Sequence, residues 1–169
     1  MLNLEISIVI YRTKINKIEK NLSYLRKGIS ASLNYFINIF DNGQDEELRD
    51  YCYEQGFNYY STGKNIGFGA GHNWVFSKRK AFGDFFLILN PDIYIDGDNI
   101  FEILSFLNRN ENVGILSPRL CYPDGSEQQI TRLFPTPISM FTRKFLNDFS
   151  DDINNLETSE VIAVPFIHG

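Results

Sequence analysis

The sequence has few cysteines, few positive charges and no long apolar runs, and each shortage excludes a class of protein. Its 169 residues include only 2 cysteines, Cys52 and Cys121, which lie far apart and lack metal-ligand spacing. They predict reduced core residues and no disulfide framework. No apolar run approaches the length of a membrane span, and the first residues lack the basic and apolar regions of a signal peptide. We therefore expect a soluble, cytoplasmic protein.

The excess of negative charge argues against nucleic acid as the main partner. The formal net charge is -5, whereas phosphate backbones are normally bound by a basic face. The short basic clusters at residues 78–80 and 143–144 are better explained as solvated helix faces. A chain of 169 residues is long enough for one domain with a substantial core. We interpret residues 1–169 as a single domain.

The spacing of apolar residues predicts an α/β protein in which strands alternate with helices. The expected strands and extended stretches cover residues 4–11, 35–40, 57–60, 85–89, 113–122, 128–131 and 161–167. The expected helices lie around residues 18–29, 45–55, 71–81, 100–107 and 138–149, with a polar loop at 150–159. This alternation favours a mostly parallel sheet with right-handed crossovers and flanking helices.

A carboxylate follows the most apolar of these strands. Residues 85–89 are a continuous run of Phe, Leu and Ile, which predicts a central strand buried on both faces. Asp92 comes directly after it in the segment Asn90-Pro91-Asp92. Open α/β sheets bind their ligands at the carboxyl ends of strands, so Asp92 suits a divalent metal that holds a phosphorylated substrate. The alternative is that Asn-Pro-Asp is a simple turn.

A glycine-rich segment precedes that strand. Residues 65–73 read Asn-Ile-Gly-Phe-Gly-Ala-Gly-His-Asn. Glycines such as Gly67 and Gly69 permit positive φ or a close approach of the backbone to a ligand. Asn65 and Asn73 could hydrogen-bond a nucleotide or only cap the loop and the following helix. The segment alone is weak evidence, and it gains weight from the strand and carboxylate that follow.

These two segments, in this order, resemble glycosyltransferase family 2, and most closely its rhamnosyltransferase-like branch. Two further motifs of the family are matched, Asp-Asn-Gly at residues 41–43 and Pro-Asp-Gly-Ser at residues 123–126. An arginine and a Pro-Thr-Pro segment at residues 132–137 are usual in that branch. The resemblance extends from Ile6 to Gly169. It implies a GT-A-type, Rossmann-like fold with a mostly parallel sheet flanked by helices.

The resemblance also implies a function and a set of site residues. Family 2 enzymes transfer a sugar with inversion from a nucleoside diphosphate to an acceptor, and the resembled branch implies rhamnose as the sugar. By resemblance, Asp92 would hold Mg²⁺ or Mn²⁺ against the diphosphate, and Asp41 would accept a hydrogen bond from the imide of a UDP- or dTDP-linked donor. The alternative for Asp41 is a residue that only forms an Asx turn. Asn90 stands where the family usually has an aspartate, so the site would be one charge poorer. The remaining residues expected at the nucleotide are Asn65, Gly67, Gly69 and Asn73.

In the family the catalytic base lies downstream of the segment that corresponds to the end of this chain. We therefore expect the chain to be the donor-binding part of a longer enzyme, with the acceptor part missing, no catalytic residue of its own, and little transfer activity alone. Its uncovered strand edge would favour a homodimer or a partner that completes the sheet. The acceptor implied is a glycan or lipid-linked glycan for a surface polysaccharide, which allows peripheral association with the inner face of the membrane.

Competing functions can be weighed against the same residues. A dinucleotide-binding oxidoreductase would place Gly-x-Gly-x-x-Gly directly after the first strand, whereas the glycine segment here follows the third, and His72 replaces the third glycine. A phosphate-binding loop of the Gly-Lys-Ser type is absent from the sequence. A non-catalytic nucleotide-sugar-binding fragment or pseudoenzyme remains an alternative.

The first prediction concerns Asp92. The chain should bind UDP or dTDP, and Mg²⁺ or Mn²⁺ should strengthen the binding, because a divalent ion bridges a carboxylate and diphosphate oxygens. The variant Asp92→Asn should lose this metal dependence and keep its fold. Calorimetric titration with and without metal measures both effects. If metal leaves the affinity of the unmutated chain unchanged, the assignment of Asp92 is wrong.

Overall fold

The structure is a computed structural model that describes residues 2–27, 33–78, 83–95 and 97–128, and the strands at 131–132 and 166–167. The chain divides into two compact units, Met1–Gly114 and Ile115–Gly169. In the first unit a parallel sheet is flanked by helices, and the described strands of the second unit form short antiparallel pairs. The predicted α/β class with a mostly parallel sheet is confirmed.

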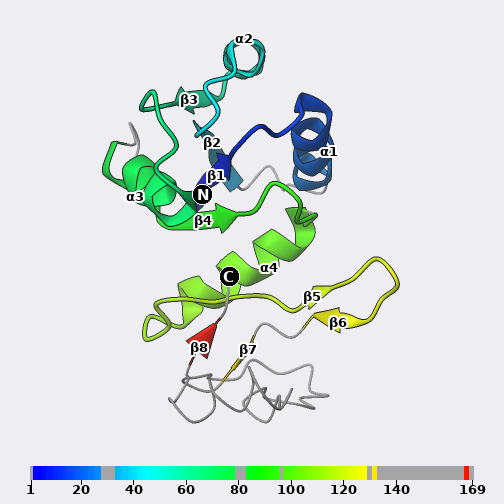
Figure 1. Ribbon diagram of the computed structural model, residues 1–169. Helices are drawn as coiled ribbons and strands as arrows, with labels where there is room; N and C mark the ends of the chain where they lie inside the picture. The colour runs from blue at the N-terminus through cyan, green and yellow to red at the C-terminus, as the bar shows by residue number, and fades with distance from the viewer. Residues whose placement is uncertain are drawn as a thin grey trace, which may run out of the picture. The chain divides into compact units, whose positions relative to one another are not determined.

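The elements of the first unit alternate as the sequence predicts (Figure 1). In chain order they are β1 (Leu2–Ile10), α1 (Ile15–Arg26), β2 (Leu33–Asp41), α2 (Glu46–Glu54), β3 (Asn58–Tyr60), α3 (Phe68–Lys78), β4 (Phe85–Leu89) and α4 (Gly97–Arg109). The second unit contains β5 (Leu120–Cys121), β6 (Glu127–Gln128), β7 (Thr131–Arg132) and β8 (Phe166–Ile167). The Pro-Asp-Gly-Ser turn joins β5 to β6, as expected.

The four strands of the first unit are parallel and lie in the order β3-β2-β1-β4. The whole of β1 pairs with β2, so that Ile10 lies opposite Asp41. On its other side β1 pairs with β4, where Ile8 lies opposite Leu89. Because all four strands run the same way, their carboxyl ends meet at one edge of the sheet.

Alternating side chains of β1 face two different layers. Leu4, Ile6, Ile8 and Ile10 are almost fully buried in a core that includes residues of α1, α2 and α4. Val9 points to the opposite face, where it packs in a second cluster with Val75 of α3. Figure 1 shows α1 and α3 on opposite sides of the strands. The sheet is therefore covered on both faces, as parallel sheets require.

The face of β1 toward α3 also carries buried polar side chains. Ser7 is fully buried, and its Oγ lies 2.8 Å from Nδ1 of His72, which is 4% exposed. Burial lowers the pKa of His72 from 6.5 to about 4, because an imidazolium is poorly solvated there. His72 is consequently neutral at physiological pH and helps to fix α3 on the sheet.

Local signals explain where α2 begins and ends. The side chain of Asp45 accepts a hydrogen bond of 3.1 Å from the backbone N–H of Leu48, which is N-capping. The acids Glu46 and Glu47 follow in the first turn, where they interact favourably with the helix dipole. After the helix, Gly56 has a φ of +73°, the left-handed conformation in which helices commonly stop.

Several expectations from the sequence are wrong. Within the described sheet β4 is an edge strand, and Ile88 is 57% exposed, so the apolar run at 85–89 is not buried on both faces. Only Leu120–Cys121 of the predicted strand 113–122 is a strand. Helix α3 begins at Phe68, three residues earlier than expected. Cys52 is a free buried cysteine as predicted, but Cys121 is exposed.

Other expectations fall outside the described residues. They are the end of the first helix beyond residue 27, the end of the third helix at 79–81, the helix at 138–149, the loop at 150–159 and most of the last strand. These stay predictions.

The second prediction concerns His72. The unfolded chain binds a proton at this histidine below pH 6.5, whereas the folded chain does so only near pH 4, so stability should fall as the pH decreases between these values. The full difference corresponds to about 3 kcal/mol. Urea unfolding at pH 7 and pH 4.5 should show a smaller loss for His72→Gln than for the unmutated chain. Parallel losses in the two proteins would contradict the buried, neutral state of His72.

Candidate functional site

The strand order makes the sheet edge at β1 and β4 the candidate ligand-binding site. The chain moves from β1 to β2 and β3 in one direction and then returns through α3 to β4, on the other side of β1. Open parallel sheets bind ligands at the carboxyl ends of strands where the direction of the chain reverses in this way. The segments that follow β1, β2, β3 and β4 therefore compose the candidate site.

Asp41, at the end of β2, organises the turn that follows. Its Oδ1 accepts a hydrogen bond of 2.6 Å from the N–H of Gly43, and its Oδ2 accepts one of 2.7 Å from the N–H of Asp45. The hydroxyl of Tyr59 on β3 donates a third hydrogen bond to Oδ2 at 2.9 Å. Asp41 is 1% exposed. The carboxylate thus shapes the turn, and its expected contact with a pyrimidine stays a prediction.

Asn42 joins this turn to the glycine-rich segment. Its Oδ1 accepts a hydrogen bond of 2.9 Å from the N–H of Ile66, and its Nδ2 donates one of 3.3 Å to the carbonyl oxygen of Gly67. Its own N–H donates to the carbonyl oxygen of Ile10 at 2.9 Å. Asn42 is 5% exposed. One buried side chain therefore connects the ends of β1 and β2 with the loop after β3.

The glycines of residues 65–73, which span this loop and the first turn of α3, have different physical roles. Gly67 has a φ of +89°, and the side chain of Asn65 accepts a hydrogen bond of 2.8 Å from its N–H. Gly71 packs so closely on the sheet that an added Cβ would lie 2.9 Å from both methyl groups of Val9. A Cβ at Gly69 would meet nothing within 4 Å, and this residue is exposed. Packing within the described chain therefore requires Gly71, whereas the backbone at Gly69 is open to a ligand.

The carboxylate predicted to bind metal lies on a turn after β4. The N–H of Ile93 donates a hydrogen bond of 3.2 Å to the carbonyl oxygen of Asn90, which closes the turn around Asp92. Asp92 is exposed and Asn90 is half-buried. Asn73, on the exposed side of α3, completes the predicted residues.

Two groups of predicted residues thus occupy one edge of the sheet. The side chain of Asn42 connects the turn after Asp41 with the loop that contains Asn65 and Gly67, and Gly69 follows in the first turn of α3. The turn with Asp92 follows β4, which is separated from β2 by β1, a distance of about 10 Å at strand spacings of 4.7–4.9 Å. A nucleoside diphosphate can extend across such an interval, with its base and its phosphates at opposite ends.

The chemistry of the donor set limits how a metal could bind. The described residues contain no cluster of three or more His, Cys, Asp or Glu side chains that could hold a metal ion by themselves. Mg²⁺ commonly uses one or two carboxylates together with substrate phosphates and water. The exposed carboxylate of Asp92 fits this second mode, in which the diphosphate supplies the other ligands.

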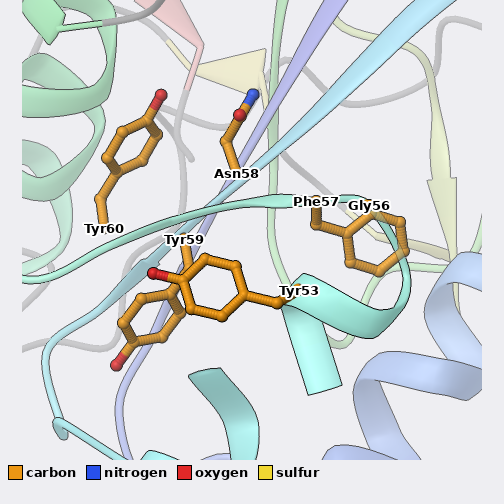
Figure 2. A pocket seen from close by; sticks show the side chains of 6 residues that line it. All are labelled: Tyr53, Gly56, Phe57, Asn58, Tyr59 and Tyr60. Atoms are coloured by element: carbon orange, nitrogen blue, oxygen red, sulfur yellow. The ribbon is translucent and has the colours of Figure 1, made fainter. Parts of the chain in front are cut away.

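A separate recess lies along the edge strand β3. It has a volume of about 300 Å³ and is lined by residues of α2, β3 and their connection. Figure 2 shows the rings of Tyr53 and Tyr59 on one side of the strand and the side chains of Asn58 and Tyr60 on the other. None of the residues predicted for the nucleotide or the metal lines this recess.

Sequence reasoning missed two residues that organise the site. Asn42 was noticed only as part of the Asp-Asn-Gly motif, because its partners, Ile66 and Gly67, are distant in the sequence. Asn21 of α1 donates hydrogen bonds to the turn that carries Asp92. A signal for it existed, since Asn21 is a polar residue on the helix face that also carries Ile18 and Leu25.

Comparison with known families agrees with the arrangement of these segments. The model of glycosyl transferase family 2 matches residues 7–164. The chain belongs to this family. The resemblance is thereby confirmed at the level of the family, and the rhamnosyltransferase-like branch stays a prediction.

The individual proteins that the chain resembles share little sequence identity with it. The chain is 28% identical over 123 residues to the low-salt glycan biosynthesis hexosyltransferase Agl10 of Haloferax volcanii. The aligned region covers 72% of this chain and 38% of that protein. A crystal structure of S. aureus TarS 1-349 has 14% identity and a TM-score of 0.49, over 78% of this chain and 42% of that one. The same protein in complex with UDP has 16% identity and a TM-score of 0.49, over 65% and 33%.

No helix in the described part of the chain is both long enough and apolar enough to cross a membrane.

The third prediction separates ligand approach from packing in the glycine-rich segment. Gly69→Val should weaken UDP binding with little change in stability, because the new side chain meets only open space in which a ligand would lie. Gly71→Ala should lower stability by about 1–3 kcal/mol, because its Cβ overlaps Val9. Thermal unfolding and calorimetric titration measure the two effects. Normal UDP affinity of a folded Gly69→Val variant would show that the ligand does not contact the backbone at Gly69.

Proposed function

We propose that this family 2 glycosyltransferase chain binds a nucleoside-diphosphate sugar at the carboxyl edge of its sheet and supports transfer of a hexosyl group from it. One observation carries the proposal. The side chain of Asn42 joins the Asp-Asn-Gly turn to the glycine-rich loop, so that two motifs distant in the sequence form one surface. The distant relative from Haloferax volcanii is named as a hexosyltransferase, which agrees with the kind of sugar.

The two ends of the site have different tasks in this proposal. The loop at residues 65–67 and the first turn of α3 receive the nucleoside, with Gly69 in that turn allowing the backbone to approach it closely. Asp41 keeps the turn after β2 in shape. Because a carboxylate has about four acceptor positions and Asp41 uses three of them, at most one is left for the imide of the base.

The turn after β4 would hold the diphosphate. Asp92 would contribute a carboxylate oxygen to Mg²⁺ or Mn²⁺, and Asn90 a neutral side chain beside it. The metal would neutralise the charge of the leaving diphosphate as a Lewis acid. With one carboxylate in place of two, the metal should bind tightly only when the nucleotide supplies further oxygens.

The finer parts of the proposal rest on the resemblance to the rhamnosyltransferase-like branch. They are inversion at the transferred sugar, a UDP- or dTDP-linked donor, and a surface glycan or lipid-linked glycan as acceptor. The chain covers only 38% of the relative from Haloferax volcanii, so the activity of the whole enzyme belongs to this proposal as well.

The fourth prediction tests the proposed function through Asn42. With Mg²⁺ present, the chain should bind UDP or dTDP more tightly than ADP. Asn42→Ala should weaken UDP binding by up to about thirtyfold, because it removes two hydrogen bonds that hold the loop, each with a net contribution of about 1 kcal/mol. Calorimetric titration gives the dissociation constants.

A matched control is Asn34→Ala, at an exposed position of β2 where the side chain donates one hydrogen bond to Asn3. This variant should bind UDP as the unmutated chain does. Equal binding of ADP and UDP would contradict the pyrimidine assignment. Unchanged UDP affinity in Asn42→Ala would contradict the site itself.

A further inference from the structure

Helix α1 holds the connection between β4 and α4 at several points along its length. The side chain of Asn21 contacts the turn that begins at Asn90. One helical turn later, the ring of Tyr24 lies 5.1 Å from the ring of Tyr94. At the end of the helix, the carbonyl oxygen of Lys27 accepts a hydrogen bond of 2.7 Å from the N–H of Gly97. The segment that carries Asp92 is therefore positioned by α1 as well as by the strand that precedes it.

The contact of Asn21 has the most specific chemistry. Its Nδ2 donates one hydrogen bond to the carbonyl oxygen of Asn90 at 3.4 Å and a second to the carbonyl oxygen of Ile93. These are the two ends of the turn around Asp92. An amide nitrogen has two hydrogens to donate, so both are used on this turn.

The orientation of this amide is fixed by its surroundings. Rotation by 180° would bring Oδ1 against the two carbonyl oxygens, which cannot donate a hydrogen bond. Asn21 is 2% exposed, and its Oδ1 has no hydrogen-bond partner within the described part of the chain. An unsatisfied buried acceptor is costly. Helix packing alone would be served better by an apolar side chain at this position, beside Ile18 and Leu25.

We propose that Asn21 is a positioning residue, which holds the turn around Asp92 in the conformation that binds a metal–diphosphate group. This inference rests on the proposed function, because it concerns the same carboxylate. It adds a residue of α1, which touches neither ligand nor metal, to the machinery of the site. Asn21 acts through the backbone of the turn, whose carbonyl oxygens it holds at both ends.

The test compares the metal-dependent gain in UDP affinity among variants. The gain is the ratio of the dissociation constants for UDP without and with Mn²⁺, measured by calorimetry on the 169-residue chain. Asn21→Leu keeps the shape of the side chain and removes both donors. We expect its gain to fall about tenfold, the lower end of the effects seen when groups that orient metal ligands are removed.

Asn38→Leu is the matched control. Asn38 is also a buried asparagine, at 1% exposure, and its amide hydrogen-bonds to Ile6 and Asn58 within the sheet. The same substitution there should change stability and leave the metal-dependent gain intact. A loss of gain in Asn38→Leu equal to that in Asn21→Leu would overturn the proposal, because any buried Asn-to-Leu change would then suffice.

Two further measurements keep the test independent of folding defects and of metal. Tyr24→Leu alters a residue that is 43% exposed, so this variant should fold. Its metal-dependent gain in UDP affinity should also decrease, by a smaller factor than in Asn21→Leu. Amide hydrogen exchange at Ile93 should become faster in Asn21→Leu and not in Asn38→Leu, since the hydrogen bond from this N–H closes the turn. Unchanged exchange at Ile93 would contradict the role of Asn21.

The same measurements distinguish a wrong role for Asn21 from a wrong role for Asp92. If the unmutated chain gains no affinity from Mn²⁺, the role of Asp92 fails and the role of Asn21 falls with it. If the unmutated chain shows the gain and Asn21→Leu retains all of it, only the inference about Asn21 fails.

Discussion

The parallel pairing of β1 with both of its neighbours is the constraint on which the rest of the structure depends. Because β2 and β4 both run parallel to β1 and are in register with it, the segments that follow all three strands meet at one edge. The site is composed of these segments and of the glycine-rich segment after β3, which pairs in parallel with β2. The apolar side chains of β1, buried on both faces, hold this arrangement in place, and burial of such side chains is the main favourable term in folding.

At that edge, buried asparagine side chains do what regular secondary structure cannot. Strands and helices satisfy their own backbone groups, but the loops that connect them leave N–H and C=O groups that need partners when buried. Asn42 supplies a donor and an acceptor to the loop after β3, and Asn21 supplies two donors to the turn after β4. An asparagine suits this task because its amide both donates and accepts hydrogen bonds.

Sequence reasoning was most successful for elements with strong local signals. The periodicity of Ile18, Leu22 and Leu25 predicted α1, and Gly56 marked the end of α2. It failed where burial depends on partners distant in the sequence. The apolar run at 85–89 predicted a central strand, but Ile88 is exposed at the edge of the described sheet. Residues 113–119 begin with the apolar side chains Val113, Ile115 and Leu116 yet contain no strand, since a strand forms only where another pairs with it.

The sequence by itself determined the family, the α/β class and the identity of the candidate residues, because these follow from local order: a strand, a turn and a motif. Only the tertiary structure decided what each residue does. Asp41 is buried beneath three of the chain's own donors, Gly71 serves packing while Gly69 is open, and Asn21 reaches a turn 69 residues away. Such roles depend on contacts between segments that only the packed sheet brings together.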